Sequence, residues 1–552
     1  MKLCAKENIS ESLAIGVLAL LAIAAYVLHL GLNDIWTPNE GFYADAAREM
    51  LASKNFLDIY YNYVPRYNKP PLQYWLIALT GKITGLNEIA VRLPSALAGL
   101  GSVFLVYRIG NLLESRTLGI WAAIVLTFSF QFAINARYGT PELVLTFFFT
   151  LSIYWLLIAF HQNRVWWLLG AYIALGLAIL TKGYPYLIVI GTIMLVYLIA
   201  DGQAGDKNWL RRLRFLRLYW GLPLALAIGL SWVGYMYWHH GSEFGEVFLR
   251  ETYHRAFTRK GAFRPFFYLE ACTWGFLPYS PIFFGALIWL AGGRFRDFGT
   301  SKVVRLGLIW FGSMLVIFTL ARGKIPTYFI QAHPGMSLLA AYFIVHFRPA
   351  PGSWRNYLFK ACYLIPGILF LVGGFAMVWR FGSSPGLYFL SLFPLVLLWL
   401  GLQFRMRRLA LPVFPFTTFA CSYLIFSLSV MPYMEQFRPH RELGKIISER
   451  GVNPTVPLMV ENFHLHSLPF YAKRKMWEYS TDSSIREQQA KGPVLLLVRE
   501  ERAKEFGPGQ VLWKGLLYGQ SESRTLEFLL DCMALEKGER GHFIPFILIY
   551  QP

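Results

Sequence analysis

The sequence has 552 residues, of which 55% are hydrophobic, 17% aromatic and only 15% charged. This composition excludes an ordinary soluble protein, and we expect a polytopic α-helical membrane protein. The formal net charge is +20, but the Lys and Arg residues lie mainly in short connectors between apolar runs, which is typical of cytoplasmic loops and not of a nucleic-acid-binding surface. The five cysteines show no paired spacing, so neither a disulfide framework nor a zinc ribbon is indicated.

Apolar runs long enough to span a bilayer recur along residues 1–432, and they predict thirteen transmembrane helices. The runs lie near residues 10–31, 87–113, 117–135, 141–161, 164–180, 184–200, 219–238, 268–291, 304–320, 327–346, 357–379, 386–402 and 409–431. The first run has no small-residue cleavage signature, which predicts a retained helix.

The connectors predict the orientation of these helices. If every run is a span, the basic connectors fall on one side, which is the cytoplasm by the positive-inside bias. The N-terminus is then cytoplasmic, and the odd number of spans places residues 433–552 outside. Two long outer loops, about 32–86 and 239–267, lie on the same outer side.

The outer side carries cations that run against this bias. Binding an anion is the simplest reason for them, and contact of snorkelling side chains with lipid headgroups is the alternative. They include Arg66, Lys69, Arg250, Arg255, Arg259, Lys260 and Arg264 in the loops, and Lys182 and Lys324 at outer helix ends.

A polar, acid-bearing segment at residues 37–50 follows the first run directly. Thr37 as N-cap, Pro38 at the first helical position and Glu40 at the third predict a helix start with a capping box. Apolar residues including Tyr43 recur at helical spacing, so we expect an amphipathic helix along the outer interface. Glu40 is then either a cap alone or a carboxylate that acts as a base or orients a donor.

Further candidates lie at the outer ends of the following helices. Pro70 holds Lys69 in an extended conformation, which suits a phosphate site, although a surface turn is the alternative. Glu142 follows Pro141 at a helix start, where an acid also favours the helix dipole. Lys324 precedes Pro326, with Tyr328 one residue inside the next helix.

In the second outer loop, Glu251, His254, Arg255 and Arg259 occur at spacings of three and four, so one helical face could carry all of them. A metal site from Glu251 and His254 has only two obvious ligands.

The tail, residues 433–552, changes in character from about residue 441. Short apolar runs at 457–460, 493–498 and 543–550 alternate with polar helical patterns at 483–489 and 525–535. This alternation predicts a small α/β domain with a partly parallel sheet.

Several motifs together resemble the bacterial lipid A aminoarabinose transferases, which belong to the protein O-mannosyltransferase-like group of GT-C glycosyltransferases. The motifs are Pro38-Asn39-Glu40-Gly41-Phe42-Tyr43-Ala44 with Arg48-Glu49-Met50-Leu51, then Tyr67-Asn68-Lys69-Pro70-Pro71, Thr181-Lys182-Gly183 and Gly323-Lys324-Ile325-Pro326-Thr327-Tyr328. The resemblance covers nearly the whole chain, including the thirteen helices and the extracytoplasmic tail. It implies a bacterial inner-membrane enzyme that moves a sugar, with inversion, from a polyprenyl-phosphate carrier such as undecaprenyl phosphate to a lipid or glycolipid acceptor such as lipid A.

The resemblance also implies roles for individual residues. Lys69 would bind the carrier phosphate, helped by Arg255 or Arg259. Glu40 would be the second acid of the family's Asp-Glu pair, and Glu142 would stand where relatives place another acid. Lys182 and Tyr328 would line the sugar and carrier cavity. Further candidates for contact with substrate or carrier phosphate are Arg66, Lys324, Tyr43 and Tyr67.

This sequence departs from the family pattern at three positions. Asn39 stands in place of the first acid, and an amide cannot accept a proton at neutral pH. Asn68 replaces a Glu and Thr252 replaces a His, so possible metal ligands are lost together and the sequence gives no firm basis for a divalent metal or another cofactor. Because a phosphate acceptor is already anionic, whereas a hydroxyl needs a base, Asn39 indicates either a phosphate acceptor or a base role for Glu40.

Other functions stay open from the sequence. A protein O-mannosyltransferase or a polysaccharide-modifying transferase would share the fold. A glycolipid transporter is a rival of another class, but such proteins often show related halves, and no internal repeat is visible in the sequence. Asn39 also allows a catalytically inactive homologue that only binds its ligand.

Overall fold

The structure is a computed structural model that describes residues 16, 20, 22–36, 38–201, 209–251, 254, 263–292, 296–382, 384–403, 407–449, 453, 455–461, 465–479, 482–520, 522 and 524–552. The chain forms two compact units. The first comprises Met1–Leu28, Tyr67–Gln73 and Arg92–Phe426, and the second comprises His29–Arg66, Tyr74–Val91 and Ser427–Pro552. The sequence prediction divided the chain at residue 432 alone, whereas the second unit also takes in most of the first outer loop.

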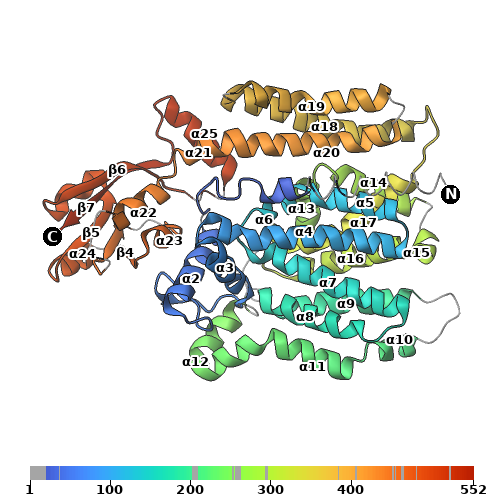
Figure 1. The fold of residues 1–552 in the computed structure, drawn as a ribbon, viewed down its shortest axis with the longest axis horizontal. Helices are drawn as coiled ribbons and strands as arrows, with labels where there is room; N and C mark the ends of the chain where they lie inside the picture. The colour runs from blue at the N-terminus through green and yellow to red at the C-terminus, as the bar shows by residue number, and fades with distance from the viewer. Residues whose placement is uncertain are drawn as a thin grey trace. The chain divides into compact units, whose positions relative to one another are not determined.

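The first unit is built from helices that pack along one another (Figure 1). α7 packs on α8, α8 on α11, α16 on α17 and α18 on α20. The helices after α4 (Glu88–Leu113), which begins in the second unit, are α5 (Arg116–Thr127), α6 (Phe130–Ala136), α7 (Pro141–Gln162), α8 (Trp167–Lys182), α9 (Pro185–Ala200), α10 (Trp209–Phe215), α11 (Leu218–Gly229), α12 (Ser231–Leu249), α13 (Phe267–Gly275), α14 (Ser280–Ala291), α15 (Arg296–Thr300), α16 (Lys302–Leu320), η2 (Pro326–Ala332), α17 (His333–His346), α18 (Trp354–Phe381), α19 (Pro385–Gln403) and α20 (Arg407–Ile425).

Six helices in the described part of the chain are long and apolar enough to cross a membrane, or eight if each of two bent pairs is one span. Four shorter apolar helices accompany them. Each predicted run from residue 87 onward coincides with a helix or with consecutive helices, while the run at 10–31 lies largely outside the described residues. The chain is therefore a polytopic helical membrane protein, and the number of thirteen spans stays a prediction.

One predicted span, residues 117–135, is broken. α5 and α6 meet at an angle of 70°. At the break, the backbone N–H of Phe130 donates to the carbonyl of Leu277, 2.8 Å away, instead of to a carbonyl of its own helix. A backbone N–H group inside a membrane protein needs a hydrogen-bond partner within the protein. The bond to Leu277 supplies this partner where the helix is interrupted.

The C-terminal tail forms a five-stranded mixed sheet in the order β4-β3-β5-β7-β6. β3 pairs in parallel with β4 and β5, and β7 pairs antiparallel with β5 and β6. The elements after η3 (Phe426–Val430) and α21 (Met431–Glu435) are α22 (His440–Glu449), β3 (Leu458–Glu461), α23 (Leu468–Ala472), β4 (Met476–Tyr479), α24 (Asp482–Gln489), β5 (Val494–Arg499), η4 (Glu500–Phe506), β6 (Gln510–Tyr518), α25 (Thr525–Glu536) and β7 (Phe543–Gln551).

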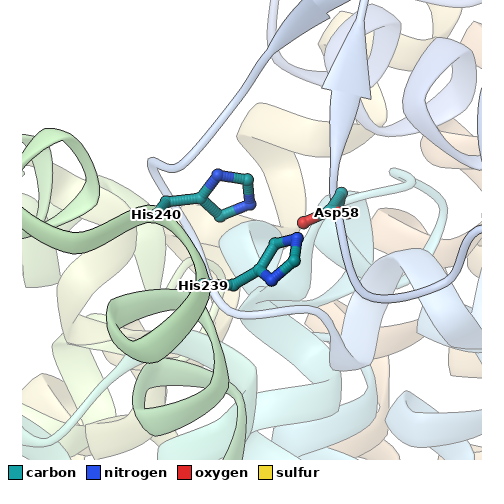
Figure 2. A group of neighbouring side chains, drawn as sticks. All are labelled: Asp58, His239 and His240. Carbon is teal, nitrogen blue, oxygen red and sulfur yellow. The ribbon is translucent and has the colours of Figure 1, made fainter.

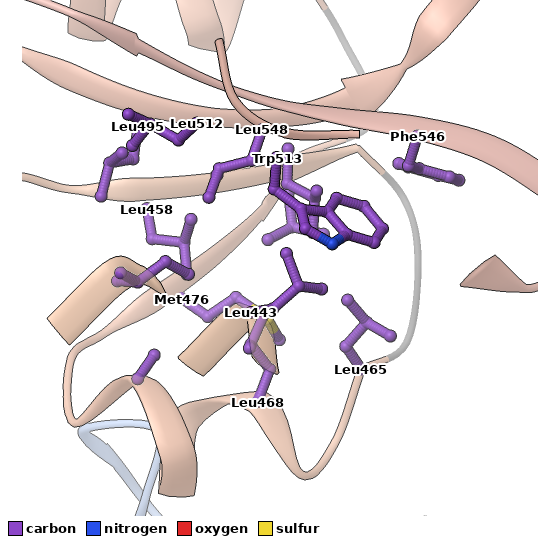
Figure 3. Close-up of a cluster of buried hydrophobic side chains, with 14 of the residues drawn as sticks. Leu443, Leu458, Leu465, Leu468, Met476, Leu495, Leu512, Trp513, Phe546 and Leu548 are labelled. Carbon is purple, nitrogen blue, oxygen red and sulfur yellow. The ribbon is translucent and has the colours of Figure 1, made fainter. Parts of the chain in front are cut away.

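Both faces of this sheet are covered. Leu495 and Leu497 of β5 belong to one buried cluster, which also takes in apolar residues of α22 and α23 (Figure 3). Val494, Leu496 and Val498 belong to a second cluster on the opposite face. Because alternate residues of a strand face opposite sides, burial on both sides explains why β5 is a continuous apolar run.

The predicted strands at 457–460, 493–498 and 543–550 and the helices at 483–489 and 525–535 all occur, and the sheet is partly parallel as expected. β4 and β6 were not predicted. β4 has exposed residues at its centre, and β6 is interrupted by a register shift between Val511 and Trp513, so neither gives a clear apolar pattern.

α2 (Asn39–Ser53) belongs to the second unit and corrects two predictions. The helix begins at Asn39, with Pro38 in the cap position, and Thr37 lies outside the described residues. Ten of its fifteen residues are buried, including Glu40, Asp45, Arg48 and Glu49. The prediction of an amphipathic helix along the outer interface was therefore wrong, because the polar side of α2 is buried as well.

Gly41 explains how closely α2 approaches the tail. A methyl group at this position would lie 2.6 Å from the carbonyl oxygen of His466. We expect Gly41→Ala to destabilise the protein by about 1–3 kcal/mol, because backbone cannot move aside as a flexible side chain can. Thermal unfolding of the purified chain tests this, with Gly191→Ala as control, since nothing lies within 4 Å of Gly191. Equal melting temperatures for the two variants would contradict the prediction.

Candidate functional site

Three predicted site residues meet in the first unit. Glu142 lies in the first turn of α7, Lys182 is the last residue of α8, and Tyr328 lies in η2. The Lys182 Nζ atom is 2.8 Å from Glu142 Oε1 and 4.8 Å from the centre of the Tyr328 ring. The two charged side chains are only 7% and 12% exposed, so they form a buried ion pair beside an aromatic ring.

Polar groups that the sequence analysis did not single out surround this ion pair. Thr327 Oγ1 donates to Glu142 Oε1 over 3.5 Å, and Gln331 Nε2 donates to Thr146 Oγ1 over 3.3 Å. Both residues lie in η2, directly after the Gly323–Tyr328 motif. Their position next to this motif was the available signal.

Two hydrogen-bond acceptor atoms in this cluster have no donor in the described part of the chain. Glu142 Oε2 and Gln331 Oε1 are buried and have no hydrogen-bond partner among the described residues. Buried polar atoms of native proteins normally have partners. Both atoms are acceptors, so the cluster suits a ligand that brings hydroxyl or ammonium donors.

Lys69 lies in a second polar group of the first unit. Its Nζ atom is 3.5 Å from Glu251 Oε2, and each side chain is 22% exposed. Nearby in sequence, the Tyr67 hydroxyl lies 3.4 Å from His240 Nδ1, and the two rings are 5.2 Å apart. The structure thus pairs Lys69 with a carboxylate, which an arriving anion could replace.

Lys324 lies just after the end of α16. Its ammonium group donates to the carbonyl oxygens of Phe318, Thr319 and Ala321 over 3.3, 2.8 and 2.9 Å. An ammonium has three donors, and here they cap the C-terminal end of α16. Lys324 is therefore a helix cap in this structure, and its contact with carrier phosphate stays a prediction.

The second outer loop is described only in part. Arg255 and Arg259 lie outside the described residues, so their contact with carrier phosphate stays a prediction. Within the described ranges, Glu251 and His254 do not belong to any group of three neighbouring ligand-type side chains. The weak metal site that the sequence suggests at Glu251 and His254 therefore stays a prediction.

His239 and His240 at the start of this loop were not singled out by the sequence analysis. Their rings lie 4.9 Å apart at an angle of 90° (Figure 2). Both come from α12 of the first unit, whereas Asp58, also drawn, belongs to the second unit. The first unit therefore supplies two imidazoles here, too few for a metal site on their own.

Asn39 and Glu40 open α2 in the second unit and differ in exposure. The Glu40 side chain is fully buried, and its Oε2 atom accepts the backbone N–H of Trp36 over 2.8 Å. Asn39 is exposed. The Glu40 carboxylate thus ties the first turn of α2 to the backbone that precedes the helix, whereas Asn39 stays exposed.

Tyr43 and Arg66 support α2. The Tyr43 ring lies 4.7 Å from that of Tyr74. The Arg66 guanidinium lies over Phe42 at 4.0 Å and near Tyr61 at 5.9 Å. A cation stacked on aromatic faces stabilises the packing, so Arg66 has a structural role in this unit.

Asp45, Arg48 and Glu49 form a buried charge cluster on α2 that the sequence analysis did not identify. Arg48 donates to Asp45 over 2.7 Å and to Glu49 over 3.3 Å. The backbone N–H groups of Asn62 and Tyr63 donate to Asp45 and Glu49, both over 2.8 Å. Burial and the neighbouring Asp45 raise the pKa of Glu49 to about 7. The cluster fixes the turn between β1 (Tyr60–Tyr61) and β2 (Val64–Pro65) against α2.

Comparison with known proteins gives a family context. Residues 68–233 match the family model described as dolichyl-phosphate-mannose-protein mannosyltransferase. A protein of Aquifex aeolicus without an assigned function is 33% identical over 511 residues, which cover 92% of this chain and 94% of the relative.

Two further proteins, both with assigned names, are similar to this chain, one in sequence and one in structure. The undecaprenyl phosphate-alpha-4-amino-4-deoxy-L-arabinose arabinosyl transferase 2 of Pseudomonas fluorescens is 30% identical over 55% of this chain. The chain spans only about half of that transferase, 51% of its length. The crystal structure of ArnT from Cupriavidus metallidurans bound to undecaprenyl phosphate matches with a TM-score of 0.71, at 20% identity, over 97% of both chains.

The chain therefore has the polytopic helical fold that ArnT of Cupriavidus metallidurans has. It belongs to the family that includes the Aquifex aeolicus relative, and over about half of its length it is similar to the arabinosyl transferases.

Proposed function

We propose that the chain transfers a sugar, with inversion, from a polyprenyl-phosphate carrier to an envelope glycolipid of the lipid A type. The proposal is supported by the arabinosyl transferase relatives and by the ArnT structure that holds undecaprenyl phosphate. The observation that carries it is the pair of cation sites in one unit of this fold, Lys69 beside Glu251 and Lys182 beside Glu142.

Lys69 is proposed to bind the carrier phosphate. When the bond between the sugar and the phosphate oxygen breaks, the departing polyprenyl phosphate gains negative charge, which a fixed ammonium stabilises. Glu251 holds the Lys69 side chain until the carrier arrives. The phosphate then takes the place of the carboxylate.

The Glu142 cluster is proposed to hold the sugar. Its buried acceptors, Glu142 Oε2 and Gln331 Oε1, can take hydrogen bonds from sugar hydroxyl or amino groups. Lys182 neutralises Glu142, so the cluster can be buried without a free charge. The Tyr328 ring offers an apolar face beside it.

Asn39 and Glu40 support a phosphate acceptor. Asn39 is exposed at the N-terminus of α2, where an amide donor and the helix dipole both favour an anion. Glu40 is buried, and its carboxylate accepts the backbone N–H of Trp36. A phosphate oxygen of the acceptor is already anionic, attacks the anomeric carbon directly and needs no base.

We expect Glu40→Gln to retain near-normal transfer, within about 3-fold, because glutamine keeps the acceptor for the Trp36 N–H and an anionic acceptor needs no base. Initial rates with purified protein measure this. A loss of about 10²–10⁴-fold would instead assign Glu40 as the base for a hydroxyl acceptor.

The direct test of the function is a reconstituted reaction. Purified protein in proteoliposomes is supplied with a polyprenyl-phosphate sugar and a phosphorylated lipid A acceptor. Mass spectrometry should then show sugar-modified acceptor together with free polyprenyl phosphate. Release of polyprenyl phosphate only when a serine- or threonine-containing acceptor is present would favour protein O-mannosyl transfer, the activity that the family model describes.

We propose the membrane arrangement that the positive-inside bias predicts. The protein crosses the bacterial inner membrane thirteen times, with the N-terminus in the cytoplasm and the tail in the periplasm. The multi-pass helical fold supports this arrangement. The transferase relatives argue against a transporter, and the polysaccharide-modifying and binding-only alternatives are tested by the same reconstituted reaction.

A further inference from the structure

We propose that Tyr471 and Arg438 of the C-terminal tail are positioning residues for the start of α2 and therefore for Asn39. This inference rests on the proposed role of Asn39 in binding the acceptor. All contacts that carry it lie within the second unit.

The backbone before α2 sets where Asn39 stands. Trp36 donates its N–H to Glu40 Oε2 over 2.8 Å, and its carbonyl accepts the N–H of Gly41 over 3.2 Å. These two bonds tie the first turn of the helix to Trp36. Any displacement of residues 34–36 is therefore passed to Asn39, which lies between the two ends of this link.

Arg438 holds this backbone from one side. It donates to the carbonyl of Ile35 over 2.9 Å, and its guanidinium lies 4.3 Å from the centre of the Trp36 ring. The arginine is itself fixed by Glu522 and Glu435 over 2.9 and 3.0 Å, and its side chain is 0% exposed. A planar guanidinium with both carboxylates in place has little freedom to move.

Tyr471 holds the same residue at its backbone N–H. The N–H of Ile35 donates to the Tyr471 hydroxyl over 2.8 Å, and that hydroxyl donates to Glu88 Oε1 over 2.8 Å. Arg441 adds ion pairs of 2.7 Å with Asp34 and with Glu88. The N–H and the carbonyl of Ile35 are thus both bonded to side chains of the tail.

Because both the N–H and the carbonyl of Ile35 are hydrogen-bonded, the orientation of this residue is fixed as well as its position. An acceptor-binding group needs such support, because small errors in its placement lower the rate steeply. Neither Tyr471 nor Arg438 needs to touch substrate for this. Tyr471 and Arg438 are then required for full turnover through their hold on the start of α2.

The test is a double-mutant cycle in the full-length protein, assayed in proteoliposomes with a polyprenyl-phosphate sugar. We expect Tyr471→Phe to lower kcat by about 10-fold while KM for the carrier stays within about 2-fold, since it loosens Asn39 and leaves the carrier site alone. In an Asn39→Ala background the same change should have no further effect. A merely structural role would give the same loss in both backgrounds.

Tyr479→Phe is the matched control. Tyr479 lies buried in β4 of the tail, and its hydroxyl has no hydrogen-bond partner among the described residues. Arg438→Lys is a second variant, which keeps the charge but loses the planar fork and should lower kcat in the same background-dependent way.

The outcomes separate the inference from the proposed function. Full activity of Asn39→Ala would reject the role of Asn39 and the inference with it. Loss of activity in Asn39→Ala, with unchanged kcat in both Tyr471→Phe and Arg438→Lys, would overturn the positioning role alone. A loss of equal size in both backgrounds, or in Tyr479→Phe, would overturn it as well.

Discussion

Lys69→Ala should reduce sugar transfer by about 10²–10³-fold, the cost of removing one fixed group that stabilises charge in a transition state. The ammonium lies 3.5 Å from Glu251, in a position where each side chain is mostly shielded from water. There it can meet the charge that forms on the departing phosphate. Initial rates with saturating acceptor, measured for purified wild-type and variant protein, give the ratio.

Two other variants test whether the loss of activity is specific to Lys69. Glu251→Gln leaves Lys69 in place and removes its competing carboxylate, so KM for the carrier should fall or stay the same. Lys324→Ala removes an outer lysine that caps α16, so it should lower stability more than catalysis. Full activity of Lys69→Ala would show that the leaving-group site lies elsewhere.

Lys182→Met should destabilise the protein by about 3–5 kcal/mol, because it leaves the Glu142 carboxylate buried without a counter-charge. The two groups are 2.8 Å apart and at most 12% exposed. Thermal unfolding in detergent, followed by the loss of monodisperse protein, measures the change.

The double variant Glu142→Gln with Lys182→Met distinguishes a charge effect from a general packing defect. Removing both charges should restore most of the lost stability, since no unpaired charge stays buried. Activity should stay low, because the acceptor pattern proposed for the sugar is gone. A double variant as unstable as Lys182→Met alone would contradict the buried-pair explanation.

Much of the helical framework could be predicted from the sequence, because a bilayer-spanning helix must be a continuous apolar run. The bend at Phe130 could not, since its backbone donor is satisfied by Leu277, almost 150 residues further along the chain. The helix start at Asn39 was predicted close to its place, but the burial of α2 was not. Residues that pack against α2, such as His466 beside Gly41, come from the tail, which is distant in sequence.

Candidate site residues could be predicted where the residue type and the local backbone pattern indicate what the side chain does. Glu142, Lys182 and Tyr328 were all singled out, and they meet. Lys324 was assigned to an anion because a lysine beside Gly and Pro looks exposed, whereas the end of α16 offered it three carbonyl oxygens. Gln331 was overlooked, because a glutamine inside an apolar run carries no charge signal.

Glu40 shows how the structure changes an inference. The sequence allowed a cap or a base, and the bond from the Trp36 N–H together with complete burial favours a structural role over a base. The exposed Asn39 then becomes the more informative residue of the pair. Its amide suits an anionic acceptor, as a carboxylate at the same position would not.

The central claim, sugar transfer to an envelope glycolipid, is tested most directly by mass spectrometry of envelope lipids. Lipids are compared from cells with the protein, without it, and with the Lys69→Ala variant. We predict that a glycolipid of the lipid A type carries one added sugar on a phosphate group only when the wild-type protein is present. Identical glycolipid masses in all three strains would contradict the claim.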